Sequence, residues 1–426
     1  MAHRTDKYEI SGPAAQKRHL SLRCRQWVVM TLPVILALSA CAEMASAPAP
    51  GVAVSDGAAG MPSDGTYGPA YGDGARPGGS YGSGPPYGGA GGFDRFSGLR
   101  GSAPAPAPPP PPRRCEVSAK LIPSCGAWWG IAPEVFTGRP PARALRGAER
   151  RMGRTADILH VYHRAGELFP TPEERALVRD PRRPRMLLVN WKPSLEHTWA
   201  EIADGAIDRR IDKLARHLTA TFPDRFFLTV HHEPENDVRA GRGSGMTAAD
   251  YVAMYRRVAF RLRERGVKNA VMVMTYMGAP NWAAKPWFES LYPGDDIVDW
   301  VALDPYADAR VRDFDGLINK TRPDFPNWPG FYRWMQRRFP GKPIMVAEWG
   351  VFERKRDPRR KERFYESVRR RIQHYPQVKA LVYFDSPKAP RGDTRFDTTP
   401  GARRAFAELA ADPYFRATKV ETGTGR

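Results

Sequence analysis

The chain lacks several features that define common protein classes. After residue 41 no segment approaches the roughly 18 consecutive apolar residues of a membrane-spanning helix, so we expect no transmembrane helix there. No glycine-rich phosphate loop follows any predicted strand, so nothing favours a nucleotide-binding fold. The HExxH spacing of zinc proteases is absent as well. With 426 residues, the chain is also too long for a small binding module or a peptide hormone.

Glycine and proline, 39 and 42 residues in all, are concentrated ahead of the part of the chain that can fold. Thirty-one of them lie in residues 42–112, a tract that ends in a polyproline run and has too little apolar surface to bury. We therefore expect a disordered Gly/Pro/Tyr-rich tether over residues 41–112 and a single domain over 113–426. The 314 residues of that domain suit an α/β barrel with insertions.

Residues 1–40 have the pattern of an export signal. Trp27–Ala40 is a run of 14 mostly apolar residues behind a basic segment, too short to span a bilayer comfortably. The run ends in Leu-Ser-Ala followed by Cys41, which resembles the lipobox of bacterial lipoproteins, where the cysteine thiol takes the lipid. We expect a lipoprotein-type signal peptide and a cell-envelope protein anchored to the membrane through Cys41. Ordinary secretion, with cleavage near Ala45 or Ala47, is the alternative.

Cysteine is scarce, and the chain contains only 4. Cys24 lies in the signal segment and Cys41 is the expected lipidation site, which leaves Cys115 and Cys125 as an isolated pair. In an oxidising compartment we expect a disulfide between them, the alternative being two free thiols.

The chain has a net charge of +20, of which residues 113–426 carry +18. A positive field attracts nucleic acid, anionic membranes or acidic polymers. Basic runs such as Glu353–Arg371, however, place apolar residues at Phe364, Val368 and Ile372, which is typical of a solvated helix face. We therefore expect no nucleic-acid partner. We also expect the protein to be a monomer.

Short β-rich runs alternate with helix-like stretches through the domain, which predicts a parallel sheet. Two such helices are Asp208–Thr219, with one apolar stripe, and Thr247–Arg265, which opens with a capping motif. Eight β/α units in one domain predict a (β/α)8 TIM barrel, with an open doubly wound sheet as the alternative. The expected strands are Gly126–Ile131, Ile158–His163, Met186–Trp191, Phe226–His231, Ala270–Tyr276, Val298–Leu303, Pro343–Glu348 and Ala380–Phe384.

The carboxyl ends of the barrel strands are where chemistry is expected. The fourth strand leads into His231, His232 and Glu233, and the seventh ends at Glu348. Two glutamates facing each other across the barrel mouth suit double displacement on a sugar, one as a general acid with a raised pKa and one as a nucleophile with a lower pKa. Glu235 and Asp237 compete with Glu233 for the acid role. Adjacent histidines on a strand point to opposite faces, so we expect no metal site.

These motifs resemble the family 26 glycoside hydrolases, which belong to a clan of retaining (β/α)8 glycanases. The resemblance covers roughly residues 125–411 and implies that Glu233 is the acid/base and Glu348 the nucleophile. It also implies that His232 bonds the sugar or tunes the acid, unless it is simply packed. After Glu233 the sequence reads Pro-Glu-Asn-Asp, where mannanases of the family usually have Met-Asn-Gly and a nearby Trp. The segments that carry the resemblance are His232–Glu233, Tyr292–Val301, Asp304–Tyr306, Glu348–Gly350 and Val382–Asp385.

Aromatic residues complete the expected site. Tyr306, at the end of the sixth strand, is placed to hold the nucleophile's carboxylate through its hydroxyl, unless it only caps the core. Trp191 and Trp349 follow the last apolar residues of their strands, so we expect both to act as platforms on which sugars stack.

The sequence thus predicts a retaining glycoside hydrolase, a β-mannanase-like endo-glycanase that cleaves β-linked polysaccharide without a cofactor. The alternative is a catalytically inactive barrel that binds polysaccharide or the cell envelope. Because the strand-end motifs supply aromatics rather than arginines, we expect a neutral glycan rather than a uronate polymer.

Overall fold

The computed structural model of the protein describes residues 115–389 and 392–416. The expected signal peptide, Cys41 and the tether lie outside these residues. Within them, the helices are too short or too polar to cross a membrane.

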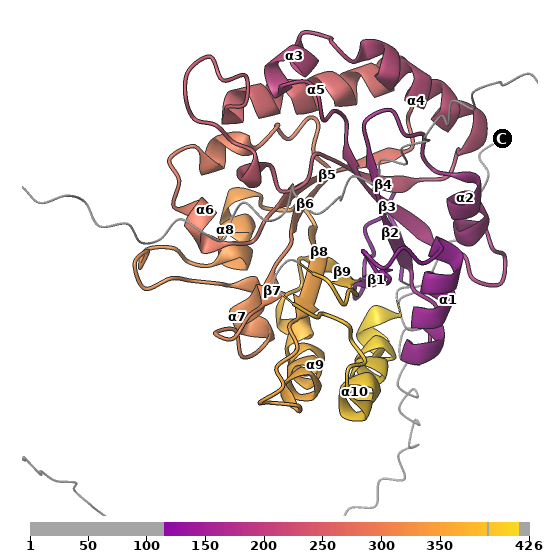
Figure 1. The fold of residues 1–426 in the computed structure, drawn as a ribbon, viewed down its shortest axis with the longest axis vertical. Coiled ribbons are helices and arrows are strands. Elements are labelled where there is room, and N and C mark those ends of the chain that lie inside the picture. The colour runs from indigo at the N-terminus through magenta and orange to yellow at the C-terminus, as the bar shows by residue number, and fades with distance from the viewer. Residues whose placement is uncertain (1–114, 390–391, 417–426) are drawn as a thin grey trace, which may run out of the picture. The chain divides into compact units, whose positions relative to one another are not determined.

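The described residues contain a closed barrel of eight parallel strands (Figure 1). Each barrel strand pairs with its sequence neighbours, and the ring closes where β1 pairs with β9. A two-residue strand, β7 (Tyr306–Ala307), pairs with the end of β8. The predicted (β/α)8 fold is therefore confirmed. The barrel strands are β1 (Trp128–Ala132), β2 (Ile158–Arg164), β3 (Met186–Lys192), β4 (Phe226–Val230), β5 (Ala270–Tyr276), β6 (Trp300–Leu303), β8 (Ile344–Val351) and β9 (Val378–Phe384).

Helices surround this ring of strands (Figure 1). Three of them are preceded by an N-cap threonine, whose side chain accepts a hydrogen bond from the backbone amide of the third helical residue. The carboxylate of that third residue accepts a hydrogen bond from the backbone amide of the threonine. The helices are α1 (Pro141–Met152), α2 (Pro172–Val178), α3 (Trp199–Ala203), α4 (Asp208–Thr221), α5 (Ala248–Glu264), α6 (Pro280–Ala283), α7 (Phe314–Ile318), α8 (Phe331–Arg338), α9 (Arg360–Arg371) and α10 (Pro400–Ala410).

The strands alternate between the barrel interior and the layer under the helices, as the period of two requires. On β3, Leu188 belongs to the interior cluster, whereas Leu187 and Val189 belong to the outer core. Gly130 on β1 leaves room for the interior, because a Cβ there would lie 2.8 Å from Val382. The apolar interior fills the amino-terminal part of the barrel, and polar side chains gather towards the carboxyl ends of the strands.

A short segment closes the amino-terminal end of the barrel. The indole nitrogens of Trp128 and Trp300 donate to the carbonyls of Leu121 and Lys120, at 2.8 and 2.7 Å. The predicted disulfide between Cys115 and Cys125 is present in this segment. It closes a short loop directly beneath the strands.

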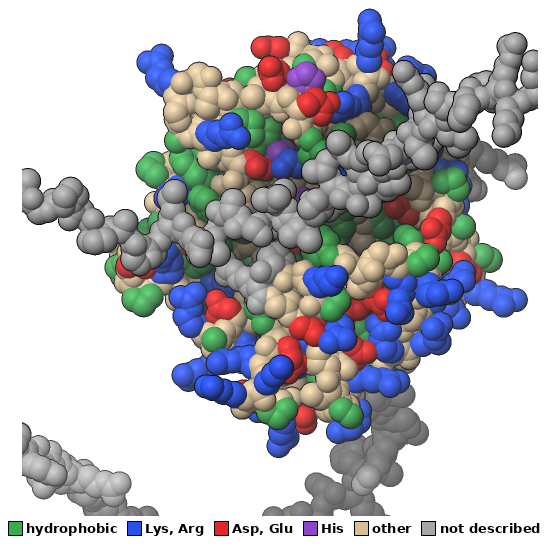
Figure 2. Space-filling model, viewed as in Figure 1, with side chains coloured by type: hydrophobic (Ala, Val, Ile, Leu, Met, Phe, Trp, Pro, Cys, Tyr) green, Lys and Arg blue, Asp and Glu red, His purple; other side chains and the backbone are tan. Residues whose placement is uncertain are grey.

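Some of the basic residues lie on the outer faces of helices. Phe364, Val368 and Ile372 are buried beneath α9, as its apolar spacing predicted. Figure 2 shows Lys and Arg side chains gathered on the flank where α1 lies, and Arg143, Arg146 and Arg150 of that helix are exposed. Part of the positive charge of the described residues therefore lies on a solvated helix face.

Candidate functional site

Glu348 reaches the barrel mouth because β8 carries an extra residue. Val346 pairs with Leu381 and Trp349 pairs with Tyr383, so three steps on β8 correspond to two on β9. A bulge of this kind places two successive side chains on the same side of a strand. Ala347 faces the interior, and the bulge aims Glu348 towards the mouth as well.

Two phenols hold the Glu348 carboxylate. The Tyr306 hydroxyl donates to Oε2 at 2.6 Å, which is the hydrogen bond expected from the sequence, and the Tyr162 hydroxyl donates to Oε1 at 2.8 Å. Burial raises the pKa of Glu348 above its ordinary value, and the two phenol hydrogen bonds oppose that shift. The net direction differs from the low pKa expected of a nucleophile, because the side chain is only 5 % exposed.

Glu233 lies on a tightly turned loop at the end of β4. His231 and Glu233 both adopt the left-handed region, with φ of 52° and 51°, which is uncommon outside glycine. The Glu233 amide donates to the Thr275 carbonyl at 3.1 Å, and the Asn236 side chain donates to Glu233 Oε2 at 3.1 Å. The loop continues as a short 3₁₀ turn, Pro234–Asn236. These contacts anchor the loop against β5.

Asp237 is occupied in holding this loop. Trp199 Nε1 donates to His231 Nδ1 at 3.1 Å, so His231 carries its proton on Nε2 and donates it to Asp237 at 2.7 Å. Lys192 donates to the same carboxylate oxygen at 2.9 Å. Burial opposes the shift, but the bonds from His231 and Lys192 lower the pKa of Asp237. A carboxylate that stays ionised and accepts two hydrogen bonds is not a proton donor.

Glu235 is buried inside the protein. It is 1 % exposed, and its Oε1 accepts the Met277 amide at 2.9 Å. Burial raises the pKa of Glu235 to about 7. Of the three acids on this loop, Glu233 alone belongs to the carboxylate cluster at the mouth.

That cluster consists of Glu233, Glu348 and Asp304, which follows β6. One carboxylate oxygen of each lies within 4.8 Å of the others. Burial, followed by the charges of Glu348 and Glu233, raises the pKa of Asp304 well above its usual range. Asp304 is thus a buried carboxyl group beside two catalytic candidates, and its surroundings disfavour its ionised form.

The spacing of Glu233 and Glu348 matches one of the two known arrangements of glycosidase carboxylates. Retaining enzymes hold the pair about 5–5.5 Å apart, and inverting enzymes leave about 6.5–9.5 Å for a water molecule. The oxygen separation within 4.8 Å agrees with the short arrangement.

Two histidines line the same site in their neutral form. Burial, with the nearby His231 and Lys192 as lesser causes, lowers the pKa of His232 to about 3, and its ring lies 6.0 Å from that of Tyr162. Burial also lowers the pKa of His160 to about 3. A neutral imidazole both donates and accepts, which suits the hydrogen-bonding role predicted for His232.

The prediction that Trp191 and Trp349 act as sugar platforms is wrong, since both residues are 0 % exposed. Trp191 shares the outward face of β3 with Leu187 and Val189, and its Nε1 donates to the Ala165 carbonyl at 3.2 Å. Trp349 is turned outward by the bulge in β8 and packs edge-on against Tyr383, with ring centroids 4.7 Å apart. A sugar cannot reach either ring.

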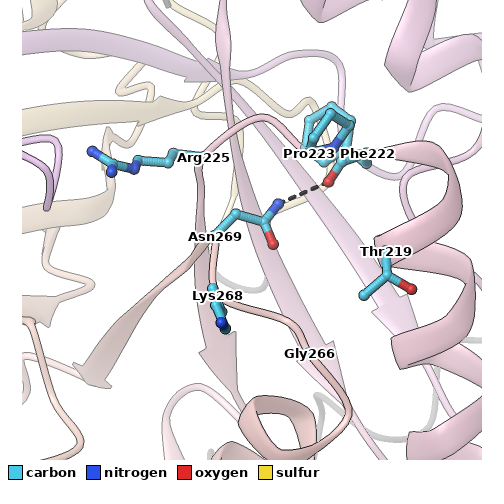
Figure 3. A pocket seen from close by; sticks show the side chains of 7 residues that line it. All are labelled: Thr219, Phe222, Pro223, Arg225, Gly266, Lys268 and Asn269. Carbon is cyan, nitrogen blue, oxygen red and sulfur yellow. Dashed lines mark hydrogen bonds between the residues drawn. The ribbon is translucent and has the colours of Figure 1, made fainter. Parts of the chain in front are cut away.

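A pocket of about 350 Å³ lies at the other end of the barrel, where α4 ends and the chain approaches β4 and β5 (Figure 3). The Asn269 side chain bonds the Phe222 carbonyl at 2.8 Å, while Arg225 points away from the remaining labelled side chains. In barrels of this type the amino-terminal face serves stability. This pocket therefore does not compete with the carboxylate cluster as the candidate active site.

Comparison with known proteins gives matches at low identity. No protein-family model matches the chain. Endoglucanase H of Acetivibrio thermocellus is 24 % identical over 295 residues, which cover 66 % of this chain and 30 % of that protein. The chain thus spans less than a third of this curated relative.

The names of several similar solved structures include glycoside hydrolase family 26. A ruminal family 26 endo-β-1,4-mannanase is 15 % identical, with 69 % of this chain and 66 % of that chain covered and a TM-score of 0.47. A modular endo-β-1,4-mannanase from Cellulomonas fimi is 16 % identical (68 % and 71 %, TM-score 0.48). A family 26 β-mannanase from Bacteroides ovatus is 14 % identical (71 % and 95 %, TM-score 0.45).

Proposed function

We propose that this protein is a retaining glycoside hydrolase that cleaves a β-linked polysaccharide by double displacement. The observation that carries the proposal is the short spacing of Glu233 and Glu348, with Glu348 fixed by two phenols at the barrel mouth. Retaining enzymes hold their two carboxyl groups close together in this way, so that one of them can attack the anomeric carbon directly.

In the first step Glu348 attacks the anomeric carbon while Glu233 gives its proton to the departing glycosidic oxygen. The products are a glycosyl ester on Glu348 and a free chain end. In the second step Glu233, now a carboxylate, takes a proton from water as the water attacks the same carbon and releases Glu348. The bonds from Tyr162 and Tyr306 stabilise the carboxylate before attack and after release.

The proposed substrate class is taken from the names of the relatives. Those relatives are called β-1,4-mannanases and an endoglucanase, so we propose a β-linked glycan and an endo-acting enzyme. We further propose that the protein works in the cell envelope, lipid-anchored at Cys41, on the basis of the signal and lipobox pattern. We also propose that it acts as a monomer.

A hydrolysis screen over mannans, glucans, xylans and uronate-containing polysaccharides tests the proposal, with Glu233→Gln and Glu348→Gln beside the wild type. General acid catalysis contributes about 10²–10⁴-fold, so Glu233→Gln should lower kcat by that factor on natural glycans and by less on substrates with an activated leaving group. Glu348→Gln should abolish turnover on both. Glu366→Gln, on the outer face of α9, is the matched control.

If Glu348→Gln still hydrolyses the glycan that wild type hydrolyses, the assignment of Glu348 as the nucleophile is wrong. Binding of a glycan without hydrolysis by wild type would instead identify a carbohydrate-binding barrel that has lost turnover.

A further inference from the structure

Large exposed apolar side chains are few in the described part of the chain. They are Phe136, which is 44 % exposed, Leu195 at 59 % and Phe260 at 40 %. Phe136 and Leu195 follow β1 and β3, on loops at the carboxyl ends of the strands, whereas Phe260 lies on α5 with the Arg256 guanidinium 5.1 Å from its ring centroid. Phe136 is thus an exposed aromatic ring on the same side of the barrel as the carboxylate cluster.

A continuous series of aromatic contacts connects Phe136 to the candidate nucleophile. The Phe136 ring lies 6.0 Å from that of Phe384, the last residue of β9. Phe384 lies 6.3 Å from Tyr162 and 5.8 Å from Tyr306. Both tyrosine hydroxyls donate to Glu348. Phe136 therefore lies two rings beyond the tyrosines that hold the nucleophile, with Phe384 between them.

The loop that presents Phe136 is held in an unusual backbone conformation. Glu134 and Phe136 have φ of 49° and 64°, in the left-handed region that non-glycine residues seldom occupy. Such residues persist where the surrounding structure fixes them. Between them, the Val135 amide donates to the Asp385 carbonyl at 2.9 Å, and the Ser386 hydroxyl donates to the Val135 carbonyl at 2.7 Å. The loop is thereby tied to the segment that follows β9.

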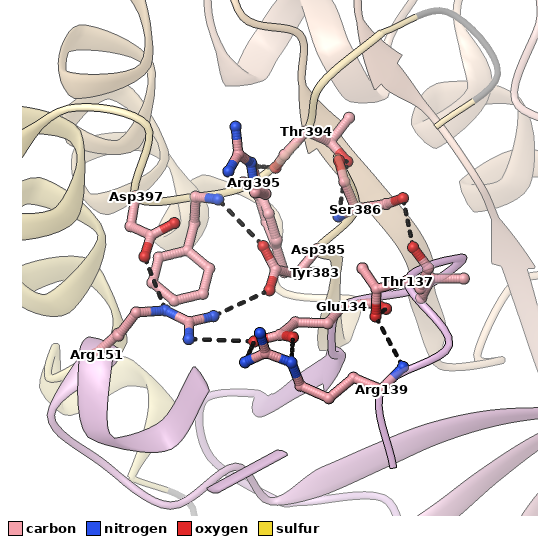
Figure 4. Close-up of polar contacts among 12 residues, drawn as sticks. Glu134, Thr137, Arg139, Arg151, Tyr383, Asp385, Ser386, Thr394, Arg395 and Asp397 are labelled. Atoms are coloured by element: carbon pink, nitrogen blue, oxygen red, sulfur yellow. Dashed lines mark hydrogen bonds and ion pairs between the residues drawn. The ribbon is translucent and has the colours of Figure 1, made fainter. Parts of the chain in front are cut away.

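An ion-pair network fixes the base of the same loop (Figure 4). Arg151, from α1, contacts Glu134 at 3.2 Å, Asp385 at 3.5 Å and Asp397 at 2.7 Å. Arg139 contacts Glu134 from the other side at 2.8 Å. The Glu134 side chain is only 10 % exposed, so these contacts are partly shielded from water. The network holds the loop in place before any ligand arrives.

We propose that Phe136 is a sugar-stacking platform, which binds a sugar unit of the polysaccharide beyond the unit that is cleaved. This inference rests on the proposed function. The apolar C–H face of a pyranose packs on an aromatic face, and a preformed loop avoids the entropy cost of ordering it on binding. A platform beyond the cleavage position is useful only for a polymer or a longer oligosaccharide. The structure therefore assigns this site to a polysaccharide rather than a disaccharide.

The test compares Phe136→Ala and Phe136→Trp, with Phe260→Ala as the control for loss of an exposed phenylalanine. kcat/KM is measured on oligosaccharides of increasing length from the glycan that wild type hydrolyses. Affinity for the longest is measured by calorimetry in the Glu233→Gln background. We expect Phe136→Ala to weaken that affinity about 2- to 10-fold, the range of single aromatic contacts, and to reduce kcat/KM more for long than for short substrates. Phe136→Trp should keep affinity near the wild-type level.

Equal affinity and an unchanged length dependence in Phe136→Ala, with the wild type active, would overturn the platform while leaving the proposed function intact. If wild type neither binds nor hydrolyses any glycan, the proposed function fails and the platform fails with it. Thermal unfolding of each variant separates a binding effect from loss of the fold, and a loss of affinity that follows a lowered Tm rather than the removal of the ring would also count against the platform.

Discussion

Removing the phenol of Tyr306 should change the pH at which the enzyme begins to work. The hydroxyl donates to Glu348 at 2.6 Å, and Tyr162 makes the equivalent bond to the other carboxylate oxygen at 2.8 Å. Both bonds favour the ionised form of Glu348, against a burial that raises the pKa of that group. In Tyr306→Phe one of the two opposing contributions is lost, so the pKa of Glu348 must rise further.

The size of the shift follows from the energy of such a bond. A hydrogen bond to a charged group contributes about 1.5–3 kcal/mol, and one pKa unit corresponds to about 1.4 kcal/mol, so Tyr306→Phe should raise the pKa of Glu348 by about 1–2 units. Only ionised Glu348 attacks the anomeric carbon. The acid limb of the kcat/KM profile should therefore move to higher pH by about the same amount.

The measurement is kcat/KM against pH for wild type, Tyr306→Phe and Tyr162→Phe. Tyr255→Phe is the matched control, because its hydroxyl bonds the Val273 carbonyl at 2.9 Å within the outer core and touches neither glutamate. The control should keep the wild-type acid limb. An acid limb that stays in place in both site variants, or that moves to lower pH, would refute the reasoning.

Three further predictions concern other parts of the chain. Burial raises the pKa of Glu235 to about 7, so wild type loses stability as the pH rises from about 4.5 to about 7 and this carboxyl must ionise in its buried site. Glu235→Gln avoids that loss, and its free energy of unfolding should exceed that of wild type by up to about 3 kcal/mol at pH values above 7. The same difference between variant and wild type at pH 5 and at pH 8 would contradict this. Cys41→Ser should move the protein from the membrane fraction to the soluble fraction without loss of hydrolysis, and retention in the membrane would discredit the lipobox. Hydrolysis of the natural glycan should change little between low and physiological salt if that glycan is neutral, whereas a steep loss with added salt on a uronate polymer, and no activity on mannan or glucan, would show an acidic substrate.

The barrel and the positions of its two strand-end glutamates could be predicted from the sequence, because both depend on local pattern. Each barrel strand is a short apolar run between helices, because both faces of a strand in a parallel sheet are buried. Glu233 and Glu348 stand where apolar runs end, which in this fold is the edge that carries chemistry.

The parts that failed depend on geometry that a linear pattern does not contain. Trp349 was expected at the mouth, but the bulge in β8 gives that direction to Glu348 instead. Trp191 could have been placed correctly by counting along β3, since it shares the parity of Leu187 and Val189. Tyr162 was missed because a tyrosine inside a buried strand has the appearance of core, and only the fold brings its hydroxyl to Glu348.

The acids around Glu233 show the same limit. Glu235 and Asp237 have the same side-chain chemistry and lie on one loop, and they differ only in their partners. Asp237 is bonded to His231 and Lys192, whereas Glu235 is turned inward against Met277. Asp304 was seen in a motif, but its contact with both glutamates arises from the closure of the barrel.

The anomeric configuration of the first product tests the central claim most directly. Proton NMR, recorded during the early minutes of hydrolysis of a β-linked oligosaccharide, distinguishes the two anomers before they interconvert. The short spacing of Glu233 and Glu348 predicts that the β-anomer appears first, with the configuration of the substrate retained. Initial release of the α-anomer would show inversion and would contradict the double-displacement mechanism.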